Sequence, residues 1–239
     1  MNRFFTDEAV QNGTVTLTDE TVHHIKNVIK LREGEPLILV KNKKELLCRI
    51  DKIEKSSIIV TVQEELETLT ENPFSITLFQ GIPKGDKMDF IVEKAVETGV
   101  TGIVPLKMNR SIAKIEGKDV AKKTERFQKI AKSAAQQSGR LIIPAVSEPK
   151  TVKQVDWSRF DLKLLCYEDE GKTTLKQVLQ QASSHENIAV VIGPEGGISP
   201  EEVTYLCDAG FCTVSLGSRI LRTETAGIYA LANLQYEFF

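Results

Sequence analysis

The sequence predicts a small β domain followed by an α/β domain with a mostly parallel sheet. From Thr14 to Leu66, apolar residues fall in short runs separated by charged turns, as in an antiparallel sheet. After about residue 73, strand-like runs alternate with helical ones. The runs LKLLCY, IAVVIG and TVSLG are continuously apolar, which is typical of parallel strands covered on both faces.

The N-terminal part should form four strands and one helix. The strands are expected at 15–17, 36–40, 45–50 and 57–62. Helical spacing of Val22, Ile25, Val28 and Ile29 predicts a helix that Gly34 ends. The polar segment 66–73 marks a boundary near Asn72, so we expect domains at 1–70 and 73–239.

The C-terminal part should alternate strands and helices. We expect strands at 75–81, 102–106, 141–146, 162–166, 188–192 and 213–216. One helix carries the apolar stripe from Met88 to Val96 and ends at Gly99, and a longer helix is expected at 119–138. A further helix begins with Ser199 as N-cap, Pro200 in its first position and Glu202 completing a capping box.

Composition narrows the functional classes. The net charge of −2 shows no global basic surplus, so an RNA site would have to be a local patch. The four cysteines, none in CxxC spacing, are expected to be reduced thiols, and the adjacent His23 and His24 to be structural, so no metal is implied. The absence of a signal-like leader or a long apolar run predicts a soluble, cytoplasmic protein without membrane contact.

Two segments that follow apolar strands are candidate ligand loops, because open parallel sheets bind ligands beyond the carboxyl ends of their strands. The first is GPEGG at 193–197, whose glycines permit a close approach of a ligand to the backbone. A tight strand-to-helix turn explains it equally well. A phosphate cradle is disfavoured, because the GK[ST] and GxGxxG patterns are absent and Glu195 would repel a phosphate.

The second segment is LGSRILRTETA at 216–226. If Ile220 and Leu221 are buried, Arg219 and Arg222 flank a desolvated pocket that can hold an oxyanion or a nucleobase carbonyl. The alternative is a helix start with surface arginines, in which Thr223 is the cap and Glu224 complements the helix dipole.

These loops, together with QGIPKGDKMDFIVEKAVETGV, AAQQSGR and HHIKNVIKLREG, resemble the SPOUT-class methyltransferases that modify N3 of a uridine in small-subunit (16S) ribosomal RNA. The resemblance covers nearly the whole chain. It implies a PUA-like N-terminal β-barrel, a C-terminal trefoil knot, S-adenosylmethionine as cofactor and a homodimer paired through the knot region. Asn109 and Gln136 depart from the family pattern, where acids are common.

The resemblance also implies site residues. Arg222 is the expected catalytic residue, with Arg219 as runner-up, and the general base is left open, with Glu195 as one candidate. The expected cofactor-binding residues are Leu165, Tyr167, Ile192, Gly193, Glu195, Gly196, Gly197, Ile198, Leu216, Gly217, Ile220, Leu221, Thr223, Thr225 and Ala226.

RNA contacts are expected from a local basic patch. Residues 107–140 hold ten Lys or Arg against three Asp or Glu, although such residues are often only the solvated face of a helix. The candidate RNA-binding residues are Arg3, Lys30, Arg32, Lys84, Lys87, Arg110 and Arg140. Two other functions stay open: a non-catalytic RNA-binding ribosome assembly factor, and a ribose 2′-O methyltransferase acting on transfer RNA.

Overall fold

The computed structural model describes residues 1–168, 170–182 and 186–238. The chain forms two compact units. The first comprises Met1–Glu71 with Gln136–Ile142, and the second comprises Asn72–Ala135 with Ile143–Phe239. The end of the long helix and the residues directly after it therefore pack with the N-terminal unit, although they lie far from it in sequence.

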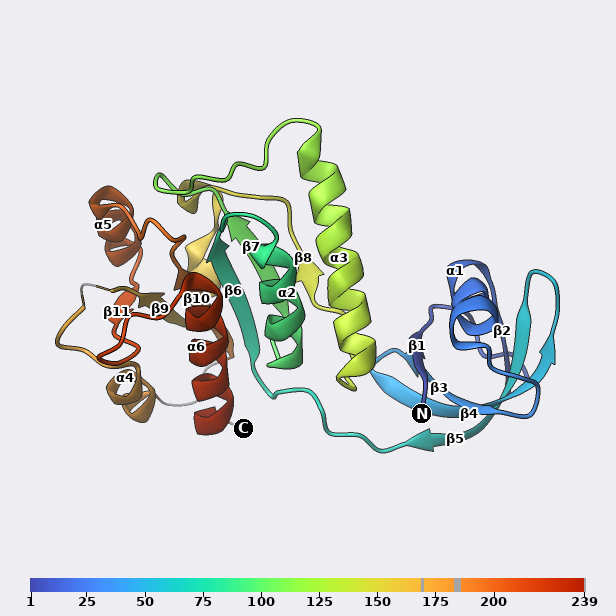
Figure 1. The fold of residues 1–239 in the computed structure, drawn as a ribbon. Helices are drawn as coiled ribbons and strands as arrows, with labels where there is room; N and C mark the ends of the chain where they lie inside the picture. The colour runs from blue at the N-terminus through green and yellow to red at the C-terminus, as the bar shows by residue number, and fades with distance from the viewer. Residues whose placement is uncertain (169, 183–185, 239) are drawn as a thin grey trace. The chain divides into compact units, whose positions relative to one another are not determined.

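The first unit is a five-stranded curled sheet in the order β1-β3-β4-β5-β2 (Figure 1). Its strands are β1 (Arg3–Phe5), β2 (Thr14–Leu17), β3 (Pro36–Lys41), β4 (Lys44–Ile53) and β5 (Ile58–Leu66). The four predicted strands are present and pair antiparallel. The sequence did not predict β1, a three-residue strand that pairs parallel with β3.

The predicted helix of this unit differs from expectation in its winding and its end. A short α1 (Asp19–His23) continues as a π-helix, η1 (His24–Ile29), and ends at Lys30, whose φ is 62°. Gly34 lies beyond this end. Because a π-helix has a wider turn than an α-helix, the predicted apolar stripe is broken: Ile25 is buried, but Val28 is 62% exposed.

The second unit contains a six-stranded sheet in the order β11-β9-β10-β6-β7-β8, with every pair parallel. Its strands are β6 (Ser75–Gly81), β7 (Gly102–Leu106), β8 (Ala145–Val146), β9 (Leu162–Cys166), β10 (Asn187–Ile192) and β11 (Cys212–Val214). The predicted architecture, a small β domain followed by an α/β domain with a parallel sheet, is confirmed.

The strand expected at 141–146 is shortened to β8 because side chains take the backbone groups of its first part. The Leu141 N–H donates to the Glu71 carboxylate at 2.7 Å, and Gln128 donates to the Pro144 carbonyl at 3.1 Å. Pro144 itself has no N–H to donate to a neighbouring strand. Only Ala145 and Val146 are left to pair with β7.

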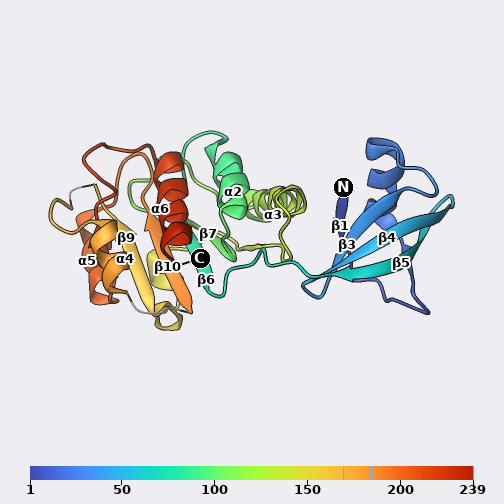
Figure 2. The same ribbon diagram turned by 90° about the horizontal axis from the view of Figure 1, so that it is seen from below.

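Helices cover both faces of this sheet. They are α2 (Lys87–Glu97), α3 (Asp119–Gln137), α4 (Leu175–Gln181), α5 (Pro200–Asp208) and α6 (Thr223–Phe238), with the short 3-10 turns η2 (Val152–Gln154) and η3 (Trp157–Arg159). Figure 2 shows α2 and α6 side by side on one face. On the opposite face, Phe79 and Val191 pack with Leu206 of α5 and Trp157 of η3. Within the described residues, no helix is long and apolar enough to cross a bilayer.

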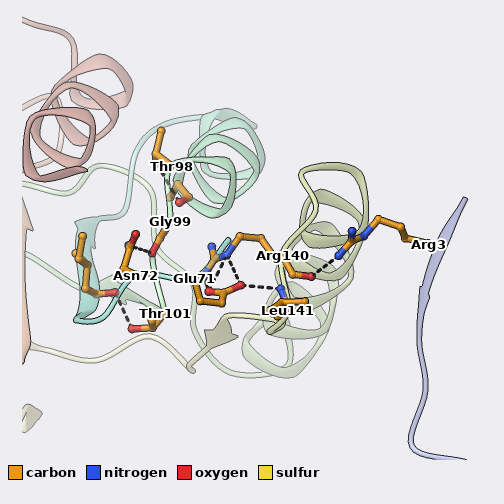
Figure 3. A network of polar contacts seen from close by, with 10 residues as sticks. Arg3, Glu71, Asn72, Thr98, Gly99, Thr101, Arg140 and Leu141 are labelled. Atoms are coloured by element: carbon orange, nitrogen blue, oxygen red, sulfur yellow. Dashed lines mark hydrogen bonds and ion pairs between the residues drawn. The ribbon is translucent and has the colours of Figure 1, made fainter. Parts of the chain in front are cut away.

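Arg140 was expected to contact RNA, but the structure gives it a different role. It is only 3% exposed, and its guanidinium donates to both carboxylate oxygens of Glu71 at 2.7–3.1 Å (Figure 3). Its carbonyl accepts a hydrogen bond from Arg3, which also forms an ion pair with Glu45. This buried, bidentate arginine links the segment Gln136–Ile142 to Glu71 within the first unit, and its guanidinium is not presented to a phosphate.

Candidate functional site

A cavity of about 640 Å³ lies beyond the carboxyl ends of β9, β10 and β11 in the second unit. Three loops form its walls, one after each strand, as the topology of a parallel sheet favours. It is lined by Lys87, Cys166, Tyr167, Glu168, Ile192, Gly193, Pro194, Glu195, Gly196, Gly197, Ser215, Leu216, Gly217, Ser218, Arg219, Ile220, Leu221, Arg222, Thr223 and Ala226. Both segments singled out in the sequence therefore face one cavity.

The glycines of the GPEGG loop are required by close packing. A Cβ on Gly193 would lie 2.7 Å from Ile198, and one on Gly196 would lie 2.8 Å from the Arg110 carbonyl oxygen. Gly197 has φ +73° and packs against the Glu168 carboxylate. The loop therefore follows a path that side chains at these positions would block, and its backbone is left to line the cavity.

The start of α5 holds the end of this loop in place. The predicted capping box is present: the Ser199 hydroxyl accepts the Glu202 N–H, and the Glu202 carboxylate accepts the Ser199 N–H. Asn109 joins it, since its backbone N–H donates to Glu202 at 2.9 Å and its amide donates to the Ser199 hydroxyl at 3.0 Å. Glu202 and Ser199 are buried, so this cap also anchors the segment that carries Arg110.

Thr223 does not act as the helix cap considered in the sequence. Its hydroxyl donates to the Gly193 carbonyl at 2.6 Å and accepts a hydrogen bond from the Gln80 amide at 2.8 Å. The first turn of α6 is therefore joined to the GPEGG loop and to β6. No local pattern in the sequence indicates this contact.

Lys87 links the same loop to α6 from the solvent side. Its ammonium lies 2.9 Å from Glu195 and 3.2 Å from Glu224. These two carboxylates, Glu195 first, raise the pKa of Lys87 above its ordinary value. Desolvation acts to raise the pKa of Glu195, but the hydrogen bonds from Lys87 and from backbone N–H groups outweigh it, so that pKa is lowered.

The two arginines line the cavity, but the apolar residues between them are not buried as expected. Ile220 is 91% exposed and Leu221 is half-buried, while Arg219 and Arg222 are both exposed. The loop lies at the surface, and within the described part of the chain both guanidinium groups stay exposed to solvent. The expected desolvated pocket between the arginines is therefore corrected to an open, cationic rim.

The loop after β9 is held by Glu170. Its carboxylate accepts hydrogen bonds from the Thr213 hydroxyl at 2.7 Å and from the backbone N–H groups of Lys172 and Thr173 at 2.8 and 3.0 Å. These bonds, the Thr213 hydroxyl first, lower the pKa of Glu170 to about 2. Burial raises the pKa of the neighbouring Cys166 thiol to about 12, so this cavity-lining cysteine is a thiol at neutral pH.

Most of the residues expected to bind a cofactor lie in the cavity wall, and three do not. Leu165 and Ile198 are buried behind it, and Thr225 is exposed on α6 outside the lining. Several lining residues, among them Glu168, Pro194, Ser215 and Ser218, are not among the residues expected to bind a cofactor. Each of these named residues lies directly after a strand or inside one of the two candidate ligand loops, and this position is the sequence feature that could have identified them.

The other residues expected to bind RNA are distributed over both units. Lys30 and Arg32 are exposed in the first unit. In the second unit, Lys84 is exposed, and its backbone N–H donates to Glu195 at 3.2 Å. Arg110 is exposed next to the GPEGG loop, with Nη1 3.4 Å from the Gly196 carbonyl. Among the described residues, no group of three or more potential metal ligands occurs.

Comparison with known proteins places this architecture in a family. Residues 70–235 match the model of an RNA methyltransferase domain, and residues 17–63 match that of an RNA methyltransferase PUA domain. Ribosomal RNA small subunit methyltransferase E of Bacillus subtilis is 34% identical, over 99% of this chain and 97% of the relative.

Comparison with solved structures supports the same family assignment. The crystal structure of a ribosomal RNA small subunit methyltransferase E from Neisseria gonorrhoeae, bound to S-adenosyl methionine, superposes with a TM-score of 0.84 at 36% identity and covers 98% of this chain and 97% of that one. A putative methyltransferase from Legionella pneumophila in complex with its cofactor gives 0.84 at 33% identity, over 98% and 96% of the two chains. The chain therefore belongs to this family of RNA methyltransferases, as its motifs predict, and carries a PUA domain ahead of its methyltransferase domain.

Proposed function

We propose that this protein transfers a methyl group from S-adenosylmethionine to N3 of a specific uridine in small-subunit ribosomal RNA. The observation that carries the proposal is the cavity built from the three loops after β9, β10 and β11, with two arginines at its rim. Relatives that match nearly the whole chain are named as small-subunit ribosomal RNA methyltransferases, and one of them was solved with the cofactor bound.

The cavity suits the proposed cofactor in size and in chemistry. Its volume of about 640 Å³ falls within the usual range for sites that hold molecules of this size. Glycines and apolar residues make up more than half of the lining, which suits an adenine ring, and charged residues such as Glu168 and Arg219 add polar groups. The cofactor carries no phosphate, which agrees with a glycine loop that contains Glu195 instead of a lysine. The residues that would hold it are those predicted residues that line the cavity, with Glu168, Pro194, Ser215 and Ser218 added.

Arg222 and Arg219 are the residues that would act on the uridine. N3 of uridine carries a weakly acidic proton, and its loss spreads negative charge onto the flanking carbonyl oxygens. A guanidinium near those oxygens stabilises the developing charge. When bound, S-adenosylmethionine supplies an electrophilic methyl group, and the cavity would orient it toward the rim that carries Arg222.

Glu195 is poorly suited to be the general base. Its pKa is lowered and its carboxylate is paired with Lys87, so it holds a proton weakly at neutral pH. We assign it the role of fixing the GPEGG loop against the loop before α2, whose Lys84 N–H it also binds. The general base is left unassigned.

The proposed RNA contacts are Lys30, Arg32, Lys84 and Arg110, whose side chains are exposed. Arg3, whose side chain is 13% exposed and paired with Glu45, is better explained as a link within the first unit. Lys87 is better explained as a link between Glu195 and Glu224. Phosphate contacts of this kind position an RNA without selecting its sequence. In this proposal the PUA domain binds the RNA and the methyltransferase domain methylates it.

We also propose the trefoil knot and a homodimer that pairs through the knot region. Support for the dimer comes from large apolar side chains left uncovered in this part of the chain, Ile220 at 91% exposure and Tyr236 at 89%. Light scattering of the purified protein tests it directly: we expect twice the mass of the 26.6 kDa chain. A single-chain mass at micromolar concentration would exclude a stable dimer.

One experiment tests the function. Small ribosomal subunits from a strain that lacks the activity are incubated with the protein and with S-adenosylmethionine labelled in its methyl group, and the labelled nucleoside is identified and mapped. We expect N3-methyluridine at one position of the small-subunit RNA. Label in a ribose 2′-O-methyl group, or label that appears only when transfer RNA is supplied, would refute the proposal. Absence of transfer together with absence of cofactor binding would favour a non-catalytic assembly factor.

A further inference from the structure

A single buried hydroxyl joins three segments of the methyltransferase domain that are distant in sequence. Thr223 is 7% exposed, and its hydroxyl lies between the amide of Gln80 on β6 and the carbonyl of Gly193 after β10. Gln80 is fully buried, and its amide nitrogen also donates to the Gly81 carbonyl at 3.0 Å. The contact therefore lies inside the protein, at the part of the cavity wall that Thr223 lines.

The direction of these hydrogen bonds is fixed by chemistry. A carbonyl can only accept, so Gly81 requires the N–H side of the Gln80 amide to face it. The second N–H of the same nitrogen then occupies an acceptor position of the Thr223 hydroxyl. The one hydroxyl proton is left for the Gly193 carbonyl, at an oxygen–oxygen distance of 2.6 Å.

The other side of the Gln80 amide supports this interpretation. Its oxygen is buried and has no hydrogen-bond partner among the described residues, close to the position where a Cβ on Gly227 of α6 would lie. Leaving a buried acceptor unpaired costs free energy. An apolar side chain at this position would avoid that cost. The presence of glutamine is therefore explained by the two hydrogen bonds that its amide donates, to the Gly81 carbonyl and to the Thr223 hydroxyl.

This contact sets the geometry between the two halves of the proposed site. Gly193 begins the GPEGG loop of the cavity, and Arg222 directly precedes Thr223. The Arg222 carbonyl accepts the N–H groups of Thr225 and Ala226, both at 2.8 Å, so the backbone of Arg222 is fixed to the first turn of α6. The Thr223 hydroxyl then fixes that turn to the loop.

We propose that Thr223 and Gln80 are positioning residues for methyl transfer: Thr223 holds the loop and the arginine at a fixed separation, and Gln80 orients the hydroxyl that does so. The inference rests on the proposed function. The ion pairs of Lys87 with Glu195 and Glu224 join the same two segments, but the side chains are only partly buried and the lysine is long and flexible, so these pairs constrain the separation less. The buried hydroxyl is the contact that defines the separation.

Four variants of the full-length protein test this, with cofactor affinity measured by calorimetry, kcat on small ribosomal subunits, and thermal unfolding. Thr223→Val keeps the shape and removes the hydroxyl. Thr223→Ser keeps the hydroxyl. Gln80→Glu offers one hydrogen-bond proton at most, so it cannot serve both Gly81 and Thr223. Thr204→Val is the control, because its hydroxyl, within the described residues, bonds to the Pro200 carbonyl alone, on the exposed side of α5.

Measured well below the melting temperature of the variant, Thr223→Val should weaken cofactor binding about tenfold. It should also lower kcat at saturating cofactor by a further factor of about ten. Thr223→Ser should retain both values within about threefold, and Gln80→Glu should lower kcat by at least about fivefold. Thr204→Val should match the wild type in affinity and kcat.

Three results would overturn the inference. One is a folded Thr223→Val protein whose affinity and kcat stay within twofold of wild type; another is a Thr223→Ser protein as impaired as Thr223→Val. If Thr223→Val does not fold, normal kcat in Gln80→Glu decides against it. These outcomes differ from failure of the proposed function, in which the wild-type protein itself neither binds S-adenosylmethionine nor methylates the RNA.

Discussion

Replacing Glu202 by glutamine tests how the cap of α5 supports the GPEGG loop. Glu202 is 6% exposed, and one of its carboxylate oxygens accepts the Asn109 N–H at 2.9 Å while the other accepts the Ser199 N–H at 3.2 Å. Glutamine keeps the shape but offers only one acceptor oxygen. Its amide group must then face one of two N–H donors.

The expected magnitude follows from these two bonds. A hydrogen bond to a charged group contributes about 2 kcal/mol, and a neutral one about 1 kcal/mol. Losing one bond and weakening the other therefore costs about 3 kcal/mol. For a domain of this size, 1 kcal/mol corresponds to about 2–4 °C, so the melting temperature of the methyltransferase domain should fall by roughly 9 °C.

The assay is thermal unfolding at neutral pH, followed by calorimetry with S-adenosylmethionine. Cofactor affinity should also fall, because the cap directly follows the GPEGG loop. Glu201→Gln is the matched control: Glu201 lies in the same helical turn and also favours the helix dipole, but it is exposed and lacks the bond to Asn109. Equal losses in the two variants, or a loss below about 1 kcal/mol for Glu202→Gln, would refute the reasoning.

Three further predictions concern the same cavity and its surroundings. Arg222→Ala should lower kcat about 10²-fold while calorimetry shows unchanged cofactor affinity; unchanged kcat would remove it from the mechanism. The pKa of Glu170 is lowered from 4.5 to about 2, so the stability that its carboxylate contributes should be complete above pH 4.5 and lost as the pH falls toward 2. The melting temperatures of the wild type and of Glu170→Gln should therefore converge only within that pH window. Arg110→Ala should weaken RNA binding at low salt and reduce the log–log salt slope by about 1, and an unchanged slope would exclude a phosphate contact.

Local patterns predicted the secondary structure because the forces that form it act over a few residues. The Ser199 to Glu202 cap, the strand alternation of the first unit and the continuous apolar strands of the second all appear where the sequence predicts them. The motifs that predict the family also follow the strands that form the cavity. The sequence alone was therefore sufficient for the fold class and for the two loops that line the site.

Local spacing was not enough where a backbone group had a distant partner. The helix ended at Lys30 instead of Gly34, and β1 escaped prediction because three residues carry little periodicity. The strand expected at 141–146 was shortened because Glu71, 70 residues earlier in the chain, takes the Leu141 N–H. The pairing of β1 with β3 and the contact of Leu141 with Glu71 leave no signal within a window of ten residues, whereas the helix end at Lys30 is a local left-handed turn whose N–H bonds to Ile25.

The roles of individual polar side chains were decided only by the tertiary structure. Arg140 was expected to contact RNA, and Thr223 was expected to bind the cofactor, with a helix cap as the alternative, but their partners Glu71 and Gly193 lie 69 and 30 residues away. The identity of a charged or hydroxyl-bearing residue does not reveal whether its side chain faces water or a buried partner. The sequence determined which loops form the candidate site, and long-range hydrogen bonding decided which of their residues line the cavity and which hold it in shape.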